Sequence, residues 1–262
     1  MSDSQSISIF SLFDNKWKFL RFLLFILFII VLIFCMVEYI NCKLSKIQHI
    51  EVQFNEKGST LILENNRLKK AEFLLTSSKC WINTGINIPS NAKIKFSVSG
   101  SATLGIHHIV DGANNDIKPI SDWIDYEGTD FKKTRLKDWD RDFVFNKAGF
   151  GQIISFFHKA GDPTPGKNNM SPNGMVIIGQ SSGGSLIQSP ANSSTLWLTV
   201  NDEVLDFSNL NKAKEQYLGK RKGKEREKWS KHFDAYIVKE DFWDLWFKDN
   251  SGQYLIKLEI EE

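Results

Sequence analysis

An uncharged apolar run from residue 22 to residue 37 is the feature that most constrains this chain. As an α-helix the run would measure about 24 Å, slightly less than a hydrocarbon core of about 30 Å. Trp17 and Tyr39 flank the run, and their rings suit the two membrane interfaces. Because the run has no amphipathic stripe, it favours a membrane-spanning helix over residues 17–40 rather than a buried core helix.

The residues at the end of the apolar run distinguish an uncleaved anchor from a cleaved signal peptide. A cleavage site needs small residues that residues 35–43, CMVEYINCK, do not supply. We therefore expect an uncleaved signal anchor. Slightly more basic residues precede the run than follow it, which favours a cytoplasmic tail at residues 1–16. In a bacterium the remaining domain would then lie in the periplasm or at the cell surface. The basic residues are Lys16, Lys18 and Arg21 before the run and Lys43 and Lys46 after it.

The overall composition narrows the class of protein. Lys and Arg number 33 against 31 Asp and Glu, so a protein that binds nucleic acid through general basicity is not expected. The hydrophobic content of 42% excludes general disorder. Three cysteines exclude both a disulfide framework and a four-thiolate zinc site. These cysteines are Cys35, Cys42 and Cys80.

Beyond residue 47 the sequence is typical of strands and loops. Short segments alternate apolar and polar residues or are rich in β-branched residues, and clusters of Gly, Asn, Ser and Asp separate them. The pattern predicts a mainly β fold, an antiparallel β-sandwich over residues 76–262, with a linker and leading strands at residues 41–75. The predicted strands are residues 50–54, 60–63, 94–98, 174–178, 195–200 and 254–260.

One charged segment interrupts the strand pattern. Residues 211–232 contain nine Lys or Arg against three Glu, a local net charge of +6, and no proline. This composition predicts a helix or helical hairpin inserted between two strands, at about residues 208–240, weakened by Gly219 and Gly223. The segment is either a solvated surface or a patch for anionic lipid, nucleic acid or an acidic protein partner.

Several blocks of the chain stand in a characteristic order. They are WINTGI at residues 81–86, FSVSG at 96–100, LWLTVND at 196–202 and DNSGQY at 249–254. Together they resemble the PA-IL-like family of bacterial galactophilic lectins, which read W-x-x-T-G-I, a strand ending in S-G, L-x-x-x-N-D and N-N-S-G. The resemblance covers about residues 79–260 and implies a galactose-binding-like β-sandwich.

The resemblance also implies a Ca²⁺ site at one end of the sandwich, where vicinal hydroxyls of a sugar complete the coordination. Asp202, Asp249 and Asn250 would supply side-chain oxygens, and Leu104 and Trp246 would supply backbone carbonyls. Carboxylates, amide oxygens and carbonyls are the ligands that calcium prefers. About 46 residues separate Asp202 from Asp249 here, whereas the family's two elements are a few residues apart. Both segments also suit ordinary turns.

Further candidate ligand-binding residues are aromatic rings and polar groups in the long loops. Trp123 opens a segment that resembles a W-x-P-x-G loop of the family, and Asp125 follows it. Trp243 lies in a ring-rich stretch just before the DNSG sequence, where it would contact a sugar or pack the insertion. His107 and His108 are adjacent, so on a strand they would point to opposite faces and could not easily share one metal ion.

Motifs of catalysis are weak in this chain. GQSSG at residues 179–183 matches G-x-S-x-G, but the sequence that follows does not predict the helix that a hydrolase nucleophile elbow needs. We therefore expect a non-enzymatic binding protein. The first hypothesis is a membrane-anchored extracytoplasmic protein that binds galactose-type carbohydrate, with Ca²⁺ as a possible cofactor. The alternative is a membrane-tethered protein–protein interaction or assembly module that has lost the sugar site.

Overall fold

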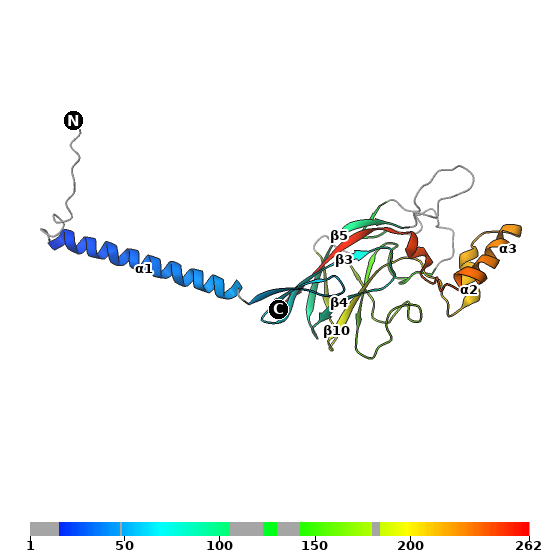
Figure 1. Ribbon diagram of the computed structural model, residues 1–262, viewed down its shortest axis with the longest axis horizontal. Coiled ribbons are helices and arrows are strands. Elements are labelled where there is room, and N and C mark those ends of the chain that lie inside the picture. Colours follow the sequence, from blue (N-terminus) through cyan, green and yellow to red (C-terminus); the bar gives the residue numbers. More distant parts are fainter. Residues whose placement is uncertain (1–15, 48, 105–122, 130–141, 180–183, 262) are drawn as a thin grey trace, which may run out of the picture. The chain divides into compact units, whose positions relative to one another are not determined.

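The computed structural model describes residues 16–47, 49–104, 123–129, 142–179 and 184–261 (Figure 1). The chain divides into two compact units after Glu51. The first contains an N-terminal helix, α1 (Lys16–Ile47), whose side chains are exposed up to Ser45. Its segment Lys16–Ser45 is long and apolar enough to cross a membrane. The sequence prediction of such a helix is confirmed to that extent.

Among the residues that the structure describes, the strands form two antiparallel sheets. The larger sheet has the order β1-β2-β3-β11-β5-β6, and β9 also pairs with β5. Its strands are β1 (Ile50–Phe54), β2 (Thr60–Glu64), β3 (Arg67–Thr76), β11 (Ser251–Glu261), β5 (Lys93–Thr103), β6 (Ile124–Asp125) and β9 (Ser185–Gln188). The smaller sheet has the order β4-β10-β7-β8. Its strands are β4 (Ile82–Ile88), β10 (Ser194–Val200), β7 (Ile153–His158) and β8 (Val176–Ile178).

The main core lies between these two sheets, which confirms the predicted β-sandwich. Alternate residues of β11 point inward, and Tyr254 and Ile256 are buried together with Phe96 of β5. Leu196 and Leu198 of β10 contribute to the same cluster from the smaller sheet. Full burial of side chains of this size is worth about 1.5–3 kcal/mol each, so the alternation drives the sheets together.

A second core covers the outer face of the smaller sheet. Ile154 and Phe156 of β7 face outward and pack against Trp81, Val144 and Phe247. Their neighbours on β7 face the main core, so this strand is buried on both sides. A strand buried on both faces reads as a continuous apolar run rather than an alternation, which is why the pattern analysis did not predict it.

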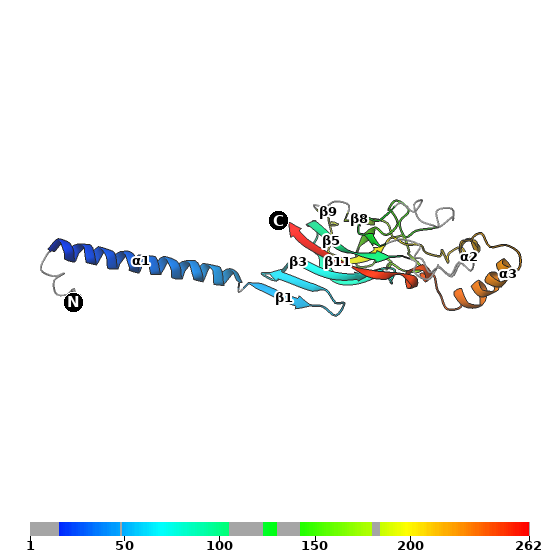
Figure 2. The ribbon, with the colours of Figure 1, turned by 90° about the horizontal axis from the view of Figure 1, so that it is seen from above.

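Helices lie between β10 and β11, as the charged segment predicted. They are α2 (Leu210–Leu218), α3 (Gly223–His232), the π-helical turn η4 (Phe233–Ile237) and the 3₁₀ turn η5 (Leu245–Asp249). We call these four elements the helical insertion. Gly219 ends α2 and Gly223 begins α3, both with positive φ, so these glycines separate two helices rather than weaken one. Figures 1 and 2 show α2 and α3 at the end of the sandwich away from the C-terminus.

Candidate binding site at one end of the sandwich

Ends of strands from both sheets meet at the end of the sandwich that carries the insertion. The last residue of β5, Thr103, pairs with Ser251 at the start of β11. Asn250 immediately precedes β11, and its amide Nδ2 donates a hydrogen bond to Asp202 Oδ2 at 2.7 Å. Asp202 follows β10 of the other sheet. This contact therefore links the two sheets at this end of the sandwich.

The Asp202 carboxylate is buried and hydrogen-bonded. Its Oδ1 accepts from the backbone N–H of Glu203 at 2.7 Å, and only 4% of the residue is exposed. Asn250 Nδ2 also donates to the carbonyl of Ser77 at 3.1 Å. A buried carboxylate needs such donors, because burying an unpaired charge costs several kcal/mol or more.

Asn201 is a residue of this site that the sequence reasoning missed. Its side chain is fully buried, and Oδ1 accepts from the backbone N–H of Phe145 at 2.9 Å. Its Nδ2 donates to the carbonyls of Phe145, Ala148 and Gly149 at 3.0–3.2 Å. Asn201 thus fixes the 145–149 loop beside Asp202. The signal available in the sequence was only its place in the LTVND block.

The other residues proposed as calcium ligands lie around this contact. Asp249 is buried and precedes Asn250 in the chain. Leu104 is fully buried and follows Thr103, whose partner is Ser251. Trp246 is buried in the core of the helical insertion, on η5. Asp202 and Asn250 are therefore in direct contact, and the remaining three come from segments that adjoin them.

The sequence-predicted ligand-binding residues fall in different surroundings. Trp123 is 64% exposed and precedes β6. The Asp125 side chain lies on β6, where Oδ1 accepts from the backbone N–H of Glu127 at 2.9 Å. Trp243 is half-buried and packs against the second core, which agrees with the expectation that it packs the insertion rather than contacts a sugar. His107 and His108 lie outside the described residues. The GQSSG sequence also falls largely outside them, and the strand β9 follows it rather than a helix.

The donor chemistry at Asp202 fits calcium in type. Asp202 contributes carboxylate oxygens, and amide and carbonyl oxygens belong to the usual calcium set. Within the described ranges, no group of three or more His, Cys, Asp or Glu side chains is placed to hold a metal ion. A calcium ion here would thus depend on the Asn250 amide, Asp249 and backbone carbonyls beside Asp202.

A ring-lined cavity of about 610 Å³ opens in the helical insertion, next to this contact. We call it the ring pocket. Its lining includes Tyr217, Trp229, His232 and Tyr236, whose neighbouring ring centroids are 5.2–6.1 Å apart. Trp229, His232 and Tyr236 are spaced three and four residues apart, which places them on one side of α3 and η4. That spacing was the signal in the sequence for this pocket, and the sequence reasoning did not use it.

Polar groups complete the ring pocket. Arg221, Lys248 and Asp249 also line it. The Arg221 guanidinium stacks over the Trp229 ring at 4.7 Å and donates to the carbonyl of Tyr217 at 2.9 Å. Tyr217 Oη and His232 Nδ1 share a hydrogen bond of 2.9 Å. Burial raises the pKa of Tyr217 to about 12, partly offset by Arg221, so its hydroxyl stays protonated at neutral pH.

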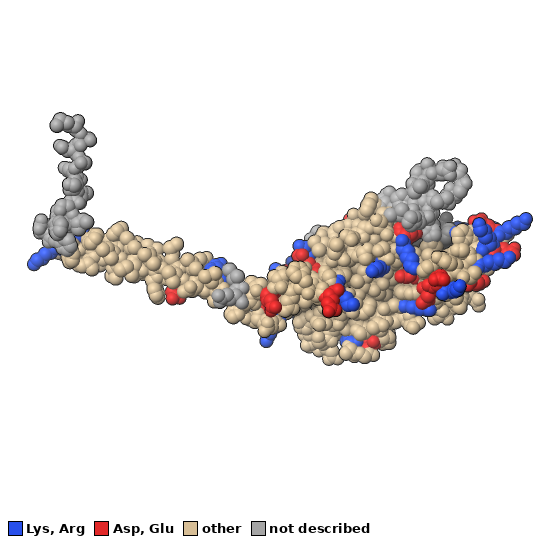
Figure 3. Space-filling view, in the orientation of Figure 1, with Lys and Arg blue, Asp and Glu red and all other residues tan. Residues whose placement is uncertain are grey.

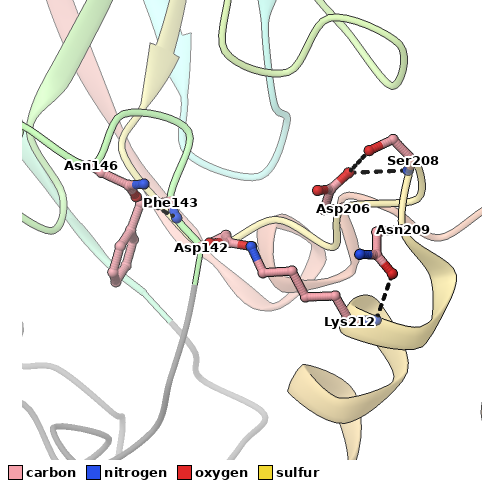
Figure 4. A network of polar contacts seen from close by, with 7 residues as sticks. All are labelled: Asp142, Phe143, Asn146, Asp206, Ser208, Asn209 and Lys212. Carbon is pink, nitrogen blue, oxygen red and sulfur yellow. Dashed lines mark hydrogen bonds and ion pairs between the residues drawn. The ribbon is translucent and has the colours of Figure 1, made fainter.

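Capping and ion-pair contacts fix the start of the insertion to the sandwich (Figure 4). Asn209 caps α2 by accepting from the backbone N–H of Lys212 at 3.1 Å. The Lys212 ammonium pairs with Asp142, which precedes the loop held by Asn201. Asp206 accepts from both the backbone and the hydroxyl of Ser208 in the turn before the helix. The insertion is thus joined to the same end of the sandwich as Asp202.

Comparisons with known proteins include a likeness to a solved structure. No protein-family model and no curated protein sequence matches the chain. Among solved structures, the chain is similar to the N-terminal domain of EclA, described as a PllA-like lectin. The match has a TM-score of 0.33 and 12% sequence identity, and it covers 72% of this chain and 95% of that one. At this TM-score and identity, the likeness assigns no site and no ligand to this chain.

Proposed function

We propose that this chain is a membrane-anchored, extracytoplasmic carbohydrate-binding protein whose site lies at the end of the sandwich around Asp202 and Asn250. The observation that carries the proposal is the Asp202–Asn250 hydrogen bond, because it brings together residues 48 positions apart that the lectin resemblance assigns to one sugar site. Helix α1 supports the anchor through its length and apolar surface.

Calcium is the proposed cofactor at this end. Asp202, Asp249 and Asn250 would hold the ion with backbone carbonyls near Leu104 and Trp246, and the bound ion would orient a sugar's vicinal hydroxyls. The Asp202 carboxylate is already aligned by Glu203 and Asn250, so it needs little reorganisation to accept an ion. A galactose-type saccharide is the ligand class that the resemblance implies.

A second candidate is a membrane-tethered interaction module that has lost the sugar site. The observation favouring it is the same carboxylate: Asp202 is buried and both its oxygens accept hydrogen bonds, as in a purely structural link between sheets. The exposed basic residues of α3 would then contact an acidic protein partner or an anionic surface.

A binding titration separates the two candidates. The full chain, in a detergent without a sugar head group, is titrated with a galactose-terminated oligosaccharide in excess calcium and again in chelator. We expect saturable binding that chelation weakens at least tenfold and that Asp202→Asn removes. The matched control, Asp234→Asn, changes an exposed carboxylate in the insertion and should bind like the wild type.

The outcomes assign the function directly. Equal binding with calcium and chelator would remove the calcium site, and binding retained in a folded Asp202→Asn variant would remove the site assignment. If no saccharide binds while charge reversal on α3 abolishes capture of a partner, the interaction module is the better function. A C-terminal alkaline phosphatase fusion tests the topology, since the enzyme is active only after export and an inactive fusion would contradict an extracytoplasmic domain.

A further inference from the structure

The ring pocket combines flat apolar surfaces with groups that bind polyols. Trp229 and Tyr236 line the pocket, and aromatic rings of this kind can stack on the apolar face of a sugar ring. The Asp249 carboxylate can accept hydrogen bonds, and the hydrogen-bonded Tyr217–His232 pair adds a polar edge. A cavity of about 610 Å³ has the size typical of small-molecule sites. This mixture suits one or two saccharide units better than a purely apolar ligand.

Lys248 gives the ring pocket an uncompensated cation. Its ammonium lies 3.5 Å from the centroid of the Phe242 ring, and the side chain is exposed. Among the described residues, no carboxylate lies within ion-pair distance of Lys248. Arg221, by contrast, faces Glu225 at 3.7 Å and donates to helix carbonyls. Lys248 is therefore the cation of this pocket that is placed to meet an anion of the ligand.

The electrostatic field of the basic residues around the ring pocket favours anionic ligands. Residues 211–232 carry a local charge of +6. Residues 233–249 hold two Lys against five Asp or Glu, so the net charge over residues 211–249 is +3. Figure 3 shows Lys and Arg side chains at the end of the molecule that carries α2 and α3, with Asp and Glu side chains among them. Such a field raises the local concentration of anionic ligands. The buried Asp249 in the lining opposes densely charged groups such as polyphosphates. One carboxylate on a polar ring therefore fits better than a nucleotide.

We propose that the ring pocket binds an acidic saccharide unit, with its carboxylate at Lys248 and its pyranose face on Trp229 and Tyr236. This proposal specifies a ligand for the carbohydrate-binding function proposed above, and it depends on that function because the ligand is a saccharide. The pocket needs no calcium, because its lining offers two cationic side chains, two tyrosine hydroxyls and an imidazole against one carboxylate.

The test uses two probes with the same sugar rings, one with free carboxylates and one with the carboxylates methylated and uncharged. Trigalacturonate and its neutral methyl ester are titrated into the full chain in a detergent without a sugar head group, in the presence of chelator. We expect the acid to bind at least about fivefold more tightly than the ester. Lys248→Gln should remove that preference and leave binding of the ester unchanged. The control Lys222→Gln removes an exposed charge at the start of α3, outside the pocket lining, and should keep the preference.

A second variant tests the stacking surface. Tyr236 is 47% exposed, so Tyr236→Leu should leave the fold intact while weakening both probes severalfold. Equal binding of acid and ester by the wild type would overturn the proposal. Equal losses for Lys248→Gln and Lys222→Gln would also overturn it, because the attraction would then be diffuse. If neither probe nor any neutral galactoside binds, the carbohydrate-binding function itself fails, which is a different result from loss of the acid preference alone.

Discussion

Replacing Asn250 by alanine tests the link between the two sheets. The variant loses one hydrogen bond to the buried Asp202 carboxylate and one to the Ser77 carbonyl. A bond to a charged group contributes about 1.5–3 kcal/mol and a neutral one about 0.5–1.5 kcal/mol, so the expected loss is about 2–4.5 kcal/mol. For a domain of this size that corresponds to a fall of roughly 5–15 °C in the melting temperature.

The assay is thermal unfolding followed by circular dichroism, with Asn169→Ala as the control. The Asn169 side chain donates an exposed hydrogen bond to the Pro163 carbonyl, and the loss of this bond should cost less than about 1 kcal/mol. A second variant, Asn250→Asp, places two carboxylates in contact and should unfold even more easily without calcium. If calcium binds here, excess calcium should raise the melting temperature of Asn250→Asp more than that of Asn250→Ala. A change below 1 kcal/mol in Asn250→Ala would refute the reasoning, because the contact would then not hold the sheets together.

Four further predictions address the scaffold. Asn201→Ala removes the hydrogen bonds that hold the 145–149 loop and should lower the free energy of unfolding by about 2–4 kcal/mol in denaturant titrations. Gly252→Ala should destabilise by at least about 1–3 kcal/mol on the same assay, because φ is +115° and a Cβ would lie 2.5 Å from the Ser101 carbonyl oxygen. Burial raises the pKa of the Cys80 thiol, so this thiol should react with a thiol reagent only when the protein unfolds. The test uses a chain in which Cys35 and Cys42 are replaced, and fast labelling of the folded protein would contradict the prediction. The pKa of Tyr217 is raised from 10 to about 12 in the folded state, so its contribution to stability is complete below pH 10 and is lost between pH 10 and 12; Tyr217→Phe should lose less stability over that interval.

Sequence patterns predicted the strands that have one buried and one exposed face. β11 buries Tyr254, Ile256 and Leu258 while residues between them face solvent, and the alternation is visible in the printed sequence. The exposed face of the same strand pairs charges across to β3, with Lys257 near Glu72 at 2.8 Å. β3 itself was not predicted, because its charged first half hides the later alternation until its partner strand is known.

The candidate site could be predicted only where its residues adjoin strand ends. Asp202 and Asn250 follow and precede predicted strands, and the family resemblance placed both at one site. The role of Asn201 depends on a loop more than 50 residues away, which no local pattern specifies. The ring pocket likewise depends on tertiary packing. It is formed where residues of α2, α3 and η4 meet residues of η5, so the sequence alone does not indicate that Trp229 and Lys248 line one cavity.

Calorimetric titration of the full chain with a galactose-terminated oligosaccharide and with trigalacturonate tests the central claim most directly. We expect saturable binding of both saccharides. Binding of the first should depend on calcium, and binding of the second should depend on Lys248. Absence of saturable binding to both, with the protein folded and calcium in excess, would contradict a carbohydrate-binding function for this end of the sandwich.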